Sequence, residues 1–306
     1  MIQERLGFPA DQKLMIAHID DIGVCHSANH ASFRALNMGI AKSGSLMMTC
    51  PWISEVARSF RDNPKWDLGI HATFNSERDN YRWRPIASSD RVSSLIDSEG
   101  YFYRDPEDVM KKGKAEEVKL ELRTQIERAH QLGFEPTHLD AHMFTCLRRT
   151  DTFEVYLSLA KEYGLVPLLI RPTSPGLANW FQAEGEEWLT PDVDRLESEG
   201  FILVDCILTS RIGPKGMPLS IEDRRDTYQR LIRECVPGLN YLTLHMAHYD
   251  YETRTAMGER PAESRSLDHQ VFMEEETGRV AENAGVKLIG WREIQKVFKE
   301  NIGYSG

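Results

Sequence analysis

The residues best suited to chemistry are acids and histidines that close apolar runs of strand length. The run 14–23, "LMIAHIDDIG", brings His18, Asp20 and Asp21 to its end. Aspartate is depleted in strands and is almost never fully buried without a partner, so two adjacent carboxylates at the end of a core strand call for an explanation. Neighbouring strand residues point to opposite faces. We expect the turn at Gly23 to let both carboxylates reach the same rim with different duties.

Three further apolar runs end in the same way, in "WDLGIHATF" (66–74), "THLDAH" (137–142) and "NYLTLHMA" (240–247). Ligands of parallel α/β folds bind beyond the carboxyl ends of the strands, so these side chains should share one rim. Within "HLDAH", alternation puts three polar groups on one face, which is costly in a buried strand unless they are used. The candidate residues of these runs and the following turn are His71, His138, Asp140, His142, His245 and His248.

Such a set favours a metal-dependent hydrolase. One carboxylate and two imidazoles leave coordination positions open for water and substrate, as catalytic metal sites require. A second carboxylate beside the ion can take a proton from the water, and a further imidazole can protonate the leaving group. Two histidines and one aspartate suit zinc, while the mixed nitrogen and oxygen donors leave magnesium, manganese and iron open.

Other histidines have a simpler interpretation. His26, His30, His130 and His269 lie on helix-like segments and are expected to be hydrogen-bonded core or surface groups. His18, inside the first run, is interpreted as satisfying a buried hydrogen bond, and no catalytic role is assigned to it.

The elements that must position these residues are short, mostly continuous apolar runs separated by helix-like stretches. Continuous runs are typical of parallel strands that are covered on both faces. Eight strands alternating with helices predict an α/β fold, an irregular or incomplete (β/α) barrel, with a doubly wound open sheet as the alternative. The predicted strands cover residues 14–20, 44–50, 66–74, 137–142, 165–170, 201–208, 240–247 and 286–290. The predicted helices cover residues 54–64, 115–133, 150–164, 220–235 and 268–285.

One segment, residues 75–106, breaks this alternation. It is long, polar and aromatic, and loops of this length in a compact domain are usually functional or disordered. Its aromatic and arginine side chains favour an ordered, lid-like insertion. We see no linker or repeat, so residues 1–306 are expected to form a single catalytic domain.

Composition excludes several other classes of protein. The chain has 306 residues and a formal net charge of −10, which argues against a nucleic-acid or anionic-membrane partner. The N-terminus lacks the pattern of a signal peptide, and no apolar stretch approaches the length of a membrane span. Five scattered cysteines, without a CxxC pair, predict neither a disulfide framework nor a structural zinc site. A cytoplasmic enzyme is the expectation.

Taken together, the motifs resemble those of the YdjC/ChbG-like carbohydrate deacetylase family. The resemblance rests on "HIDDIGVCHSAN", "LGIHATF", "THLDAHMF" and "YLTLHMA" in this order and spacing. The segments "YRWRPIASSDRVSSLIDSEGYFY" and "AGVKLIGWRE" are also similar to that family, so the resemblance covers nearly the whole chain.

The resemblance implies an irregular (β/α) barrel of the polysaccharide deacetylase type, one divalent metal ion (zinc or magnesium), and hydrolytic removal of an N-acetyl group from an amino sugar or oligosaccharide. Carried over by matching motifs, Asp20 is the implied general base. Asp21, His71 and His142 are the implied metal ligands, and His245 is the implied general acid.

The resemblance also implies substrate-binding residues. Arg171, in "LLIRP", matches an arginine expected to orient substrate or Asp20. Trp83 and Tyr81 are expected to stack on a sugar face. His138 and Asp140 are also expected to bind substrate.

The sequence departs from the family's pattern at four positions. The family commonly has asparagine in place of His18, histidines in place of Met143 and Phe144, and proline in place of Met246. The histidines of the family would line the substrate side of the metal, so their replacement concerns sugar specificity. The proline change leaves the acid open between His245 and His248.

Two other functions remain as alternatives. A metal-dependent barrel isomerase or aldolase acting on a free sugar would also carry histidine and aspartate at its strand ends, but usually with a lysine or further glutamate there. A non-catalytic sugar- or metal-binding relative is the second alternative. The expected partner is a small-molecule N-acetylated sugar substrate, and the oligomeric state is left open, with a homodimer as one option.

Overall fold

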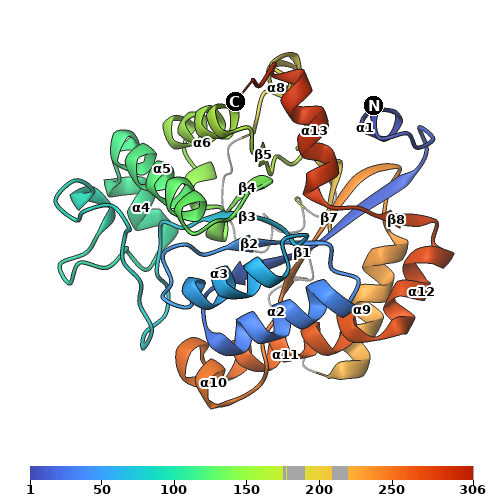
Figure 1. Cartoon of the computed structure of the whole chain (residues 1–306), viewed down its shortest axis with the longest axis horizontal. Helices are drawn as coiled ribbons and strands as arrows, with labels where there is room; N and C mark the ends of the chain where they lie inside the picture. The colour runs from blue at the N-terminus through green and yellow to red at the C-terminus, as the bar shows by residue number, and fades with distance from the viewer. Residues whose placement is uncertain (175–176, 178–189, 209–219, 306) are drawn as a thin grey trace.

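The computed structural model describes residues 1–174, 177, 190–208 and 220–305. Within them, eight parallel strands form one curled sheet in the order β5-β4-β3-β2-β1-β7-β6, with β8 also paired to β1 (Figure 1). The strands are β1 (Lys13–Ile22), β2 (Ser43–Leu46), β3 (Asp67–Ala72), β4 (His138–Ala141), β5 (Val166–Pro167), β6 (Cys206–Leu208), β7 (Gly238–His245) and β8 (Val286–Leu288).

The sheet comes back on itself, because the chain after β5 meets the chain before β6. Ile170 and Val204 form an isolated parallel bridge, and the Val204 N–H donates to the carbonyl of Leu169 at 2.7 Å. β1 lies at the centre, with β7 along one edge and β8 and β2 sharing the other edge in turn. The predicted irregular parallel barrel is therefore confirmed.

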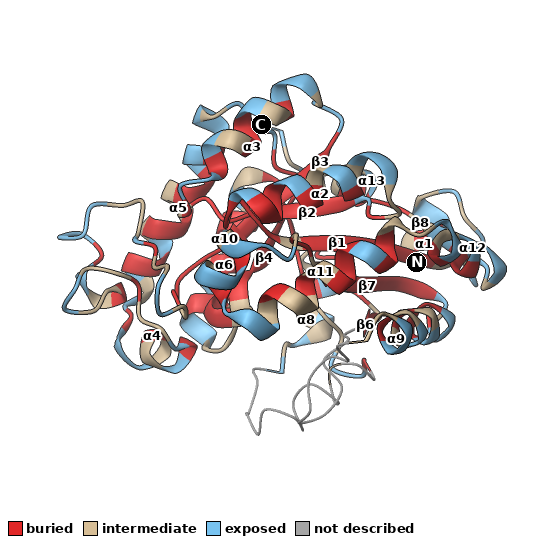
Figure 2. Cartoon of the chain, turned by 90° about the horizontal axis from the view of Figure 1, so that it is seen from below, coloured by how far each residue is buried: buried red, intermediate tan, exposed pale blue. Residues whose placement is uncertain are grey.

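Helices cover the outside of the sheet, and the strands between them are almost wholly buried (Figure 2). The helices are α1 (Ile2–Arg5), α2 (His26–Met38), α3 (Ile53–Asp62), η1 (Ser93–Leu95), α4 (Pro106–Lys112), α5 (Ala115–Gln131), η2 (His142–Leu147), α6 (Thr150–Tyr163), α8 (Val193–Ser198), α9 (Ile221–Arg233), α10 (Tyr251–Met257), α11 (Glu259–Met273), α12 (Glu275–Asn283) and α13 (Trp291–Asn301). Among these described helices, none is both long and apolar enough to cross a membrane.

One helix prediction was wrong in its bounds. Residues 268–285 are not one helix, because the chain leaves helical geometry at Glu274 (φ −77°, ψ 130°) and divides the segment between α11 and α12. α11 also begins earlier, at Glu259, and this start brings Arg265 into the region of the site. The five cysteines are buried and free, as expected for thiols without a disulfide framework.

The segment 75–106 is ordered and has apolar contacts of its own. Val92, Leu95 and Phe102 are fully buried, and Phe102 pairs with Ile96 in an antiparallel bridge. Glu121 of α5 accepts hydrogen bonds from the backbone of residues 86 and 87 and so ties the segment to that helix. Its function as a lid stays a prediction.

Candidate active site and metal centre

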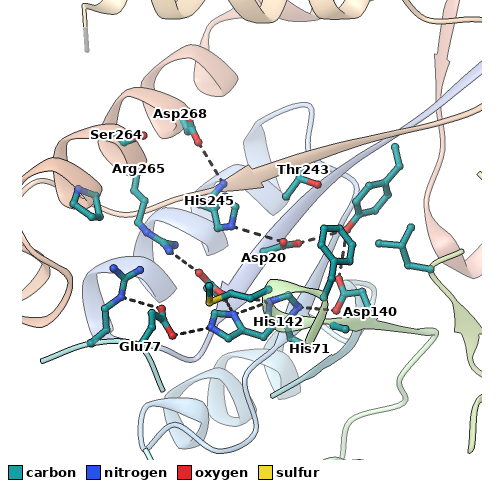
Figure 3. Close-up of a pocket in the computed structure, with 18 of the residues that line it drawn as sticks. Asp20, His71, Glu77, Asp140, His142, Thr243, His245, Ser264, Arg265 and Asp268 are labelled. Carbon is teal, nitrogen blue, oxygen red and sulfur yellow. Dashed lines mark hydrogen bonds and ion pairs between the residues drawn. The ribbon is translucent and has the colours of Figure 1, made fainter. Parts of the chain in front are cut away.

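A pocket of about 380 Å³ opens at the carboxyl ends of the central strands (Figure 3). The register of the sheet explains how residues from distant parts of the chain meet there. On neighbouring strands, Asp20 of β1 is paired with His245 of β7, and His71 of β3 is paired with Asp140 of β4. The lining consists of Asp20, Asp21, His71, Glu77, Arg78, Asp140, Ala141, His142, Met143, Phe144, Arg148, Leu168, Tyr241, Thr243, His245, Pro261, Ser264, Arg265 and Asp268.

The two adjacent aspartates reach the pocket because the backbone of β1 changes direction between them. Asp21 has φ of 63°, in the left-handed region that residues other than glycine seldom adopt. The expected turn residue, Gly23, also has a positive φ (102°), but the change begins one residue after Asp20. Strained backbone of this kind concentrates at functional sites. Here it aims both carboxylates at one pocket.

Asp21, His71 and His142 form a triangle of three potential ligand atoms. Asp21 Oδ1 lies 3.3 Å from His71 Nε2 and 3.2 Å from His142 Nδ1, and the two nitrogens are 3.3 Å apart. All three residues are buried.

This triangle fits a metal ion. Two ligands that bind zinc at tetrahedral angles, with bonds of about 2.0–2.1 Å, lie about 3.3–3.4 Å from each other. Asp21 Oδ1 is also buried without a hydrogen-bond partner among the described residues, which is costly for a carboxylate oxygen unless an ion binds it. The donor set and its spacing therefore suit a divalent ion with positions left open toward the pocket.

Each of the three candidate ligands is held from behind by a charged partner. His71 Nδ1 lies 2.7 Å from Asp140 Oδ1, and His142 Nε2 lies 3.1 Å from Glu77 Oε2. Arg265 donates to the second oxygen of Asp21 at 2.6 Å. Carboxylates behind metal-binding histidines fix the ring and its tautomer, so the arrangement is typical of a metal centre.

The charges of these residues are strongly coupled. Burial alone would raise the pKa of Asp21, but the positive charge of Arg265 and the nearby imidazoles of His142 and His71 hold it well below its usual value. Burial opposes charge on His71 and His142, yet the carboxylates of Asp140 and Glu77 raise their pKa values. Protons consequently compete with a metal ion for both imidazoles, and metal binding should weaken as the pH falls.

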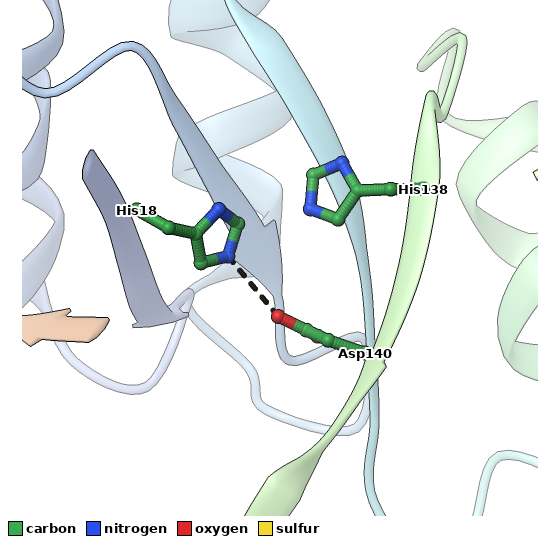
Figure 4. Close-up of side chains that lie close together, drawn as sticks. All are labelled: His18, His138 and Asp140. Atoms are coloured by element: carbon green, nitrogen blue, oxygen red, sulfur yellow. Dashed lines mark ion pairs between the residues drawn. The ribbon is translucent and has the colours of Figure 1, made fainter. Parts of the chain in front are cut away.

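His18, which had no assigned role, anchors the layer below the site (Figure 4). Its Nε2 lies 3.1 Å from Asp140 Oδ2, and its Nδ1 lies 2.8 Å from the hydroxyl of Ser43. Asp140 thus bridges His18 and His71. The expectation of a buried hydrogen bond is confirmed, and its effect is to orient the carboxylate that orients His71.

Two other groups of ligand-type atoms lie close together, namely His18, His138 and Asp140, and Asp20, His71 and Asp140. The first lies below the pocket, because His18 and His138 are fully buried and neither lines it. The second shares His71 and Asp140, whose facing atoms already contact each other at 2.7 Å. Asp21, His71 and His142 all line the pocket. Their group also contains a buried oxygen, Asp21 Oδ1, that has no hydrogen-bond partner among the described residues.

Asp20 and His245 lie beside the triangle. His245 Nε2 is 3.7 Å from Asp20 Oδ2, and the His245 side chain is 34% exposed. Burial raises the pKa of Asp20 to about 6, with His71 opposing the rise and Asp140 adding to it. His248, the other candidate acid, does not line the pocket and instead contacts His30 at 2.9 Å.

Four predicted substrate-binding residues lie elsewhere. Trp83 is 3% exposed, donates a hydrogen bond to the carbonyl of Asn75 and packs edge-on against His142. Tyr81 packs against Trp83. Neither residue therefore presents a free ring to the pocket. His138 stacks on Trp291 inside the barrel. Arg171 pairs with Asp205 and Glu197, outside the pocket lining, because the chain after β5 turns to bridge Val204.

Sequence reasoning missed several residues of the site. Glu77 and Arg78 lie a few residues after β3, at the start of the segment 75–106. The available signal was their position as a charged pair at the end of "HATFNSER", soon after His71. Arg265 comes from the face of a helix far along the chain, and no motif indicated it. Met143 and Phe144, in left-handed conformation with φ of 51° and 53°, line the pocket where the family commonly has histidines.

Replacing Glu77 with glutamine should lower metal affinity about 10–100-fold, as is usual for an outer partner of a histidine ligand. The substitution removes the charge that holds His142 Nε2, while the rest of the triangle stays in place. Zinc affinity can be measured by competition with a chromogenic chelator. Glu99→Gln is the matched control, because Glu99 belongs to the same segment and pairs with Arg82 at the surface. Equal affinities for the two variants would contradict this role of Glu77.

Fold and site together define a class: an α/β protein whose curled parallel sheet gathers a buried group of histidines and aspartates, able to hold a metal ion, at the carboxyl ends of its strands. The model of the YdjC-like protein family matches residues 14–283. The chain therefore belongs to the YdjC-like family.

Relatives agree with this assignment. The chain is 34% identical over 295 residues to a carbohydrate deacetylase of Thermus thermophilus, covering 96% of this chain and 98% of that protein. It is 28% identical over 134 residues to a chitooligosaccharide deacetylase of Yersinia enterocolitica, covering 43% of this chain and 49% of that protein. A solved structure from Enterococcus faecalis V583, described as a candidate cellobiose-phosphate cleavage protein, has a TM-score of 0.70 at 22% identity, covering 92% and 99% of the two chains. The last likeness concerns the fold.

Proposed function

We propose that this protein is a metal-dependent carbohydrate deacetylase that hydrolyses the N-acetyl group of an amino sugar or of a short oligosaccharide. The observation that carries the proposal is the triangle of Asp21, His71 and His142 beside a second carboxylate, Asp20, in one pocket. The full-length similarity to a carbohydrate deacetylase supports the same reaction class.

Asp21, His71 and His142 would hold the ion. When bound, a divalent ion supplies Lewis acidity toward the acetamide carbonyl and makes a water molecule more acidic. Zinc suits two imidazoles and one carboxylate, and magnesium is the second candidate.

The remaining chemistry belongs to protein side chains. Asp20, ionised above its raised pKa, takes a proton from the attacking water. His245, protonated and partly exposed at the pocket, donates a proton to the departing amine. Since the two residues are only 3.7 Å apart, the proton taken by Asp20 has a short path to His245. Tyr241, whose hydroxyl lies 3.5 Å from Asp20, helps to hold the carboxylate in place.

Acetate release is the direct test of this function. The purified protein is incubated with N-acetylglucosamine, with di- and tri-N-acetylchitooligosaccharides and with other N-acetylated sugars, and acetate is measured enzymatically. We expect release from at least one substrate, loss after chelation and recovery when zinc or magnesium is added back. A metal-loaded protein inert toward every acetylated sugar would contradict the proposal.

A sugar isomerase or aldolase is less well supported, because the described lining of the pocket contains no lysine. Its one glutamate, Glu77, contacts His142 and is thereby occupied. Isomerisation of free sugars without acetate release would favour that alternative.

The dependence of activity on pH should show an acid limb set by Asp20. Its pKa in the folded protein is raised from 3.8 to about 6, so the base is protonated, and inactive, as the pH falls through that value. A bound cation favours the carboxylate form, so the limb should lie at or below pH 6 when the metal is saturating. The measurement is kcat/KM from pH 4 to 9 at saturating metal. Activity that is undiminished at pH 4 would contradict the assignment of Asp20.

A further inference from the structure

Helix α2 lies beside α10 and α11 (Figure 1). Four of the chain's ten histidines belong to this region. They are His26, His30, His248 and His269, and none of them lines the pocket. We propose that His30 and His248, with His26 beside them, form a second site that binds a divalent transition-metal ion.

The backbone brings these imidazoles together from two elements. His26 and His30 are four residues apart on α2, a spacing that places two histidines on one helix face and is used for metal chelation. Their ring centroids are 6.3 Å apart. His248 follows β7, and its Nε2 lies 2.9 Å from His30 Nδ1. The backbone N–H of His248 donates to the carbonyl of Ser27, which ties this turn to α2.

His26 is already oriented as a metal ligand would be. Its Nδ1 lies 2.7 Å from Glu55 Oε1, and the other oxygen of Glu55 accepts from Asn29 at 2.8 Å. A carboxylate on one ring nitrogen fixes the tautomer and leaves the other nitrogen with its lone pair. The His26 side chain is 53% exposed, so an ion can reach it from solvent.

His269 supports the cluster from the protein interior. It is 8% exposed, and its Nε2 has no hydrogen-bond partner among the described residues. Its ring meets that of His248 edge-on at 5.0 Å. Arg34, four residues after His30 on α2, places a positive charge near the same rings.

The facing ring nitrogens of His30 and His248 lie close enough to bind one ion. Ligands at right angles around an ion, with bonds of about 2.0–2.1 Å, lie about 2.8–3.0 Å apart, as in square-planar or octahedral coordination. The separation of 2.9 Å between His30 Nδ1 and His248 Nε2, which is also that of a hydrogen bond, lies within this range. Imidazole nitrogens suit Zn²⁺, Ni²⁺ and Cu²⁺, and nickel is therefore a suitable probe of the second site.

The site would couple metal binding to the turn that follows β7. His248 lies three residues after His245, and the intervening Met246 and Ala247 are buried. An ion held by His30 and His248 would fasten this turn to α2. The inference stands independently of the reaction proposed for the pocket, because it uses none of the pocket's residues.

Calorimetric titration of NiCl₂ into the zinc-loaded full chain tests the proposal. We expect one equivalent of nickel to bind without release of the loaded zinc. His30→Gln should weaken nickel binding at least tenfold, and Arg34→Gln should strengthen it by removing a nearby positive charge. His130→Gln is the matched control, because His130 lies on another helix, α5, against Tyr163, and it should bind nickel as the unaltered chain does.

Two results would overturn the proposal. The first is the absence of nickel binding to the unaltered chain above that of His30→Gln. The second is an equal loss of affinity in His30→Gln and His130→Gln, which would indicate weak, unselective binding to surface histidines. Thermal unfolding of every variant, measured without nickel, shows whether the fold is intact.

Discussion

Replacing Asp20 with asparagine should reduce acetate release by about 10³-fold while leaving metal content unchanged, because a positioned general base typically contributes 10²–10⁴-fold. Asparagine keeps the shape of the side chain but cannot accept the proton of water. Asp20 lies outside the triangle of Asp21, His71 and His142, so the bound ion should remain. The measurement combines steady-state acetate release with metal analysis of the same sample.

Stability provides the control for this variant. Burial raises the pKa of Asp20 to about 6, so at pH 7 the ionised carboxylate disfavours the folded state. Asp20→Asn should therefore unfold at the same temperature as the original chain or at a higher one.

Loss of the metal from Asp20→Asn, with its activity retained, would reverse the roles of the two aspartates.

Replacing Asp21 with asparagine should have the opposite pattern, with loss of both metal and activity. Zinc affinity should fall by at least about 100-fold. This loss is larger than the one expected for a residue that supports a ligand without binding the ion, such as Glu77. Asparagine tolerates the left-handed backbone at this position (φ 63°), so the substitution tests the charge rather than the turn. Arg265 would lose its buried carboxylate, and breaking such a pair destabilises by about 3 kcal/mol.

The two aspartate variants control for each other. Zinc should raise the unfolding temperature of the original chain and of Asp20→Asn, because it binds the folded state. Zinc should leave the unfolding temperature of Asp21→Asn unchanged. A zinc-dependent rise in Asp21→Asn equal to that of the original chain would exclude Asp21 as a ligand.

The sheet and the inner part of the site could be predicted because they rest on local patterns. Continuous apolar runs indicate buried parallel strands, and the polar residue that ends each run must lie at the carboxyl edge. This reasoning brought Asp20, Asp21, His71, Asp140, His142 and His245 to one rim, and all of them line the pocket. It brought His18, His138 and His248 to the same rim, and these three do not line the pocket. The left-handed backbone of Asp21 was not predictable, because nothing in "HIDDIG" distinguishes it from a turn at Gly23.

The substrate side of the site could not be predicted, for a physical reason. Tyr81 and Trp83 stand in a polar segment, and aromatic residues in such segments suggest sugar stacking. The structure instead uses Trp83 as a buried support for His142. Whether an aromatic ring in a long loop faces solvent or packs inward depends on tertiary contacts that no local pattern encodes.

Arg171 and Arg265 illustrate the same limit. Arg171 follows a strand, yet β5 is only two residues long and the chain turns away to bridge Val204. Arg265 lies 244 residues after Asp21 and meets it only because α11 packs beside β7. Contacts between residues this far apart in the chain follow from the packing of whole elements.

The most direct test of the central claim is anomalous diffraction at the zinc edge from crystals of the zinc-loaded protein. The account predicts one peak in the pocket, about 2.0–2.2 Å from Asp21 Oδ1, His71 Nε2 and His142 Nδ1. A pocket without a peak, or a peak held instead by His18, His138 and Asp140, would contradict it.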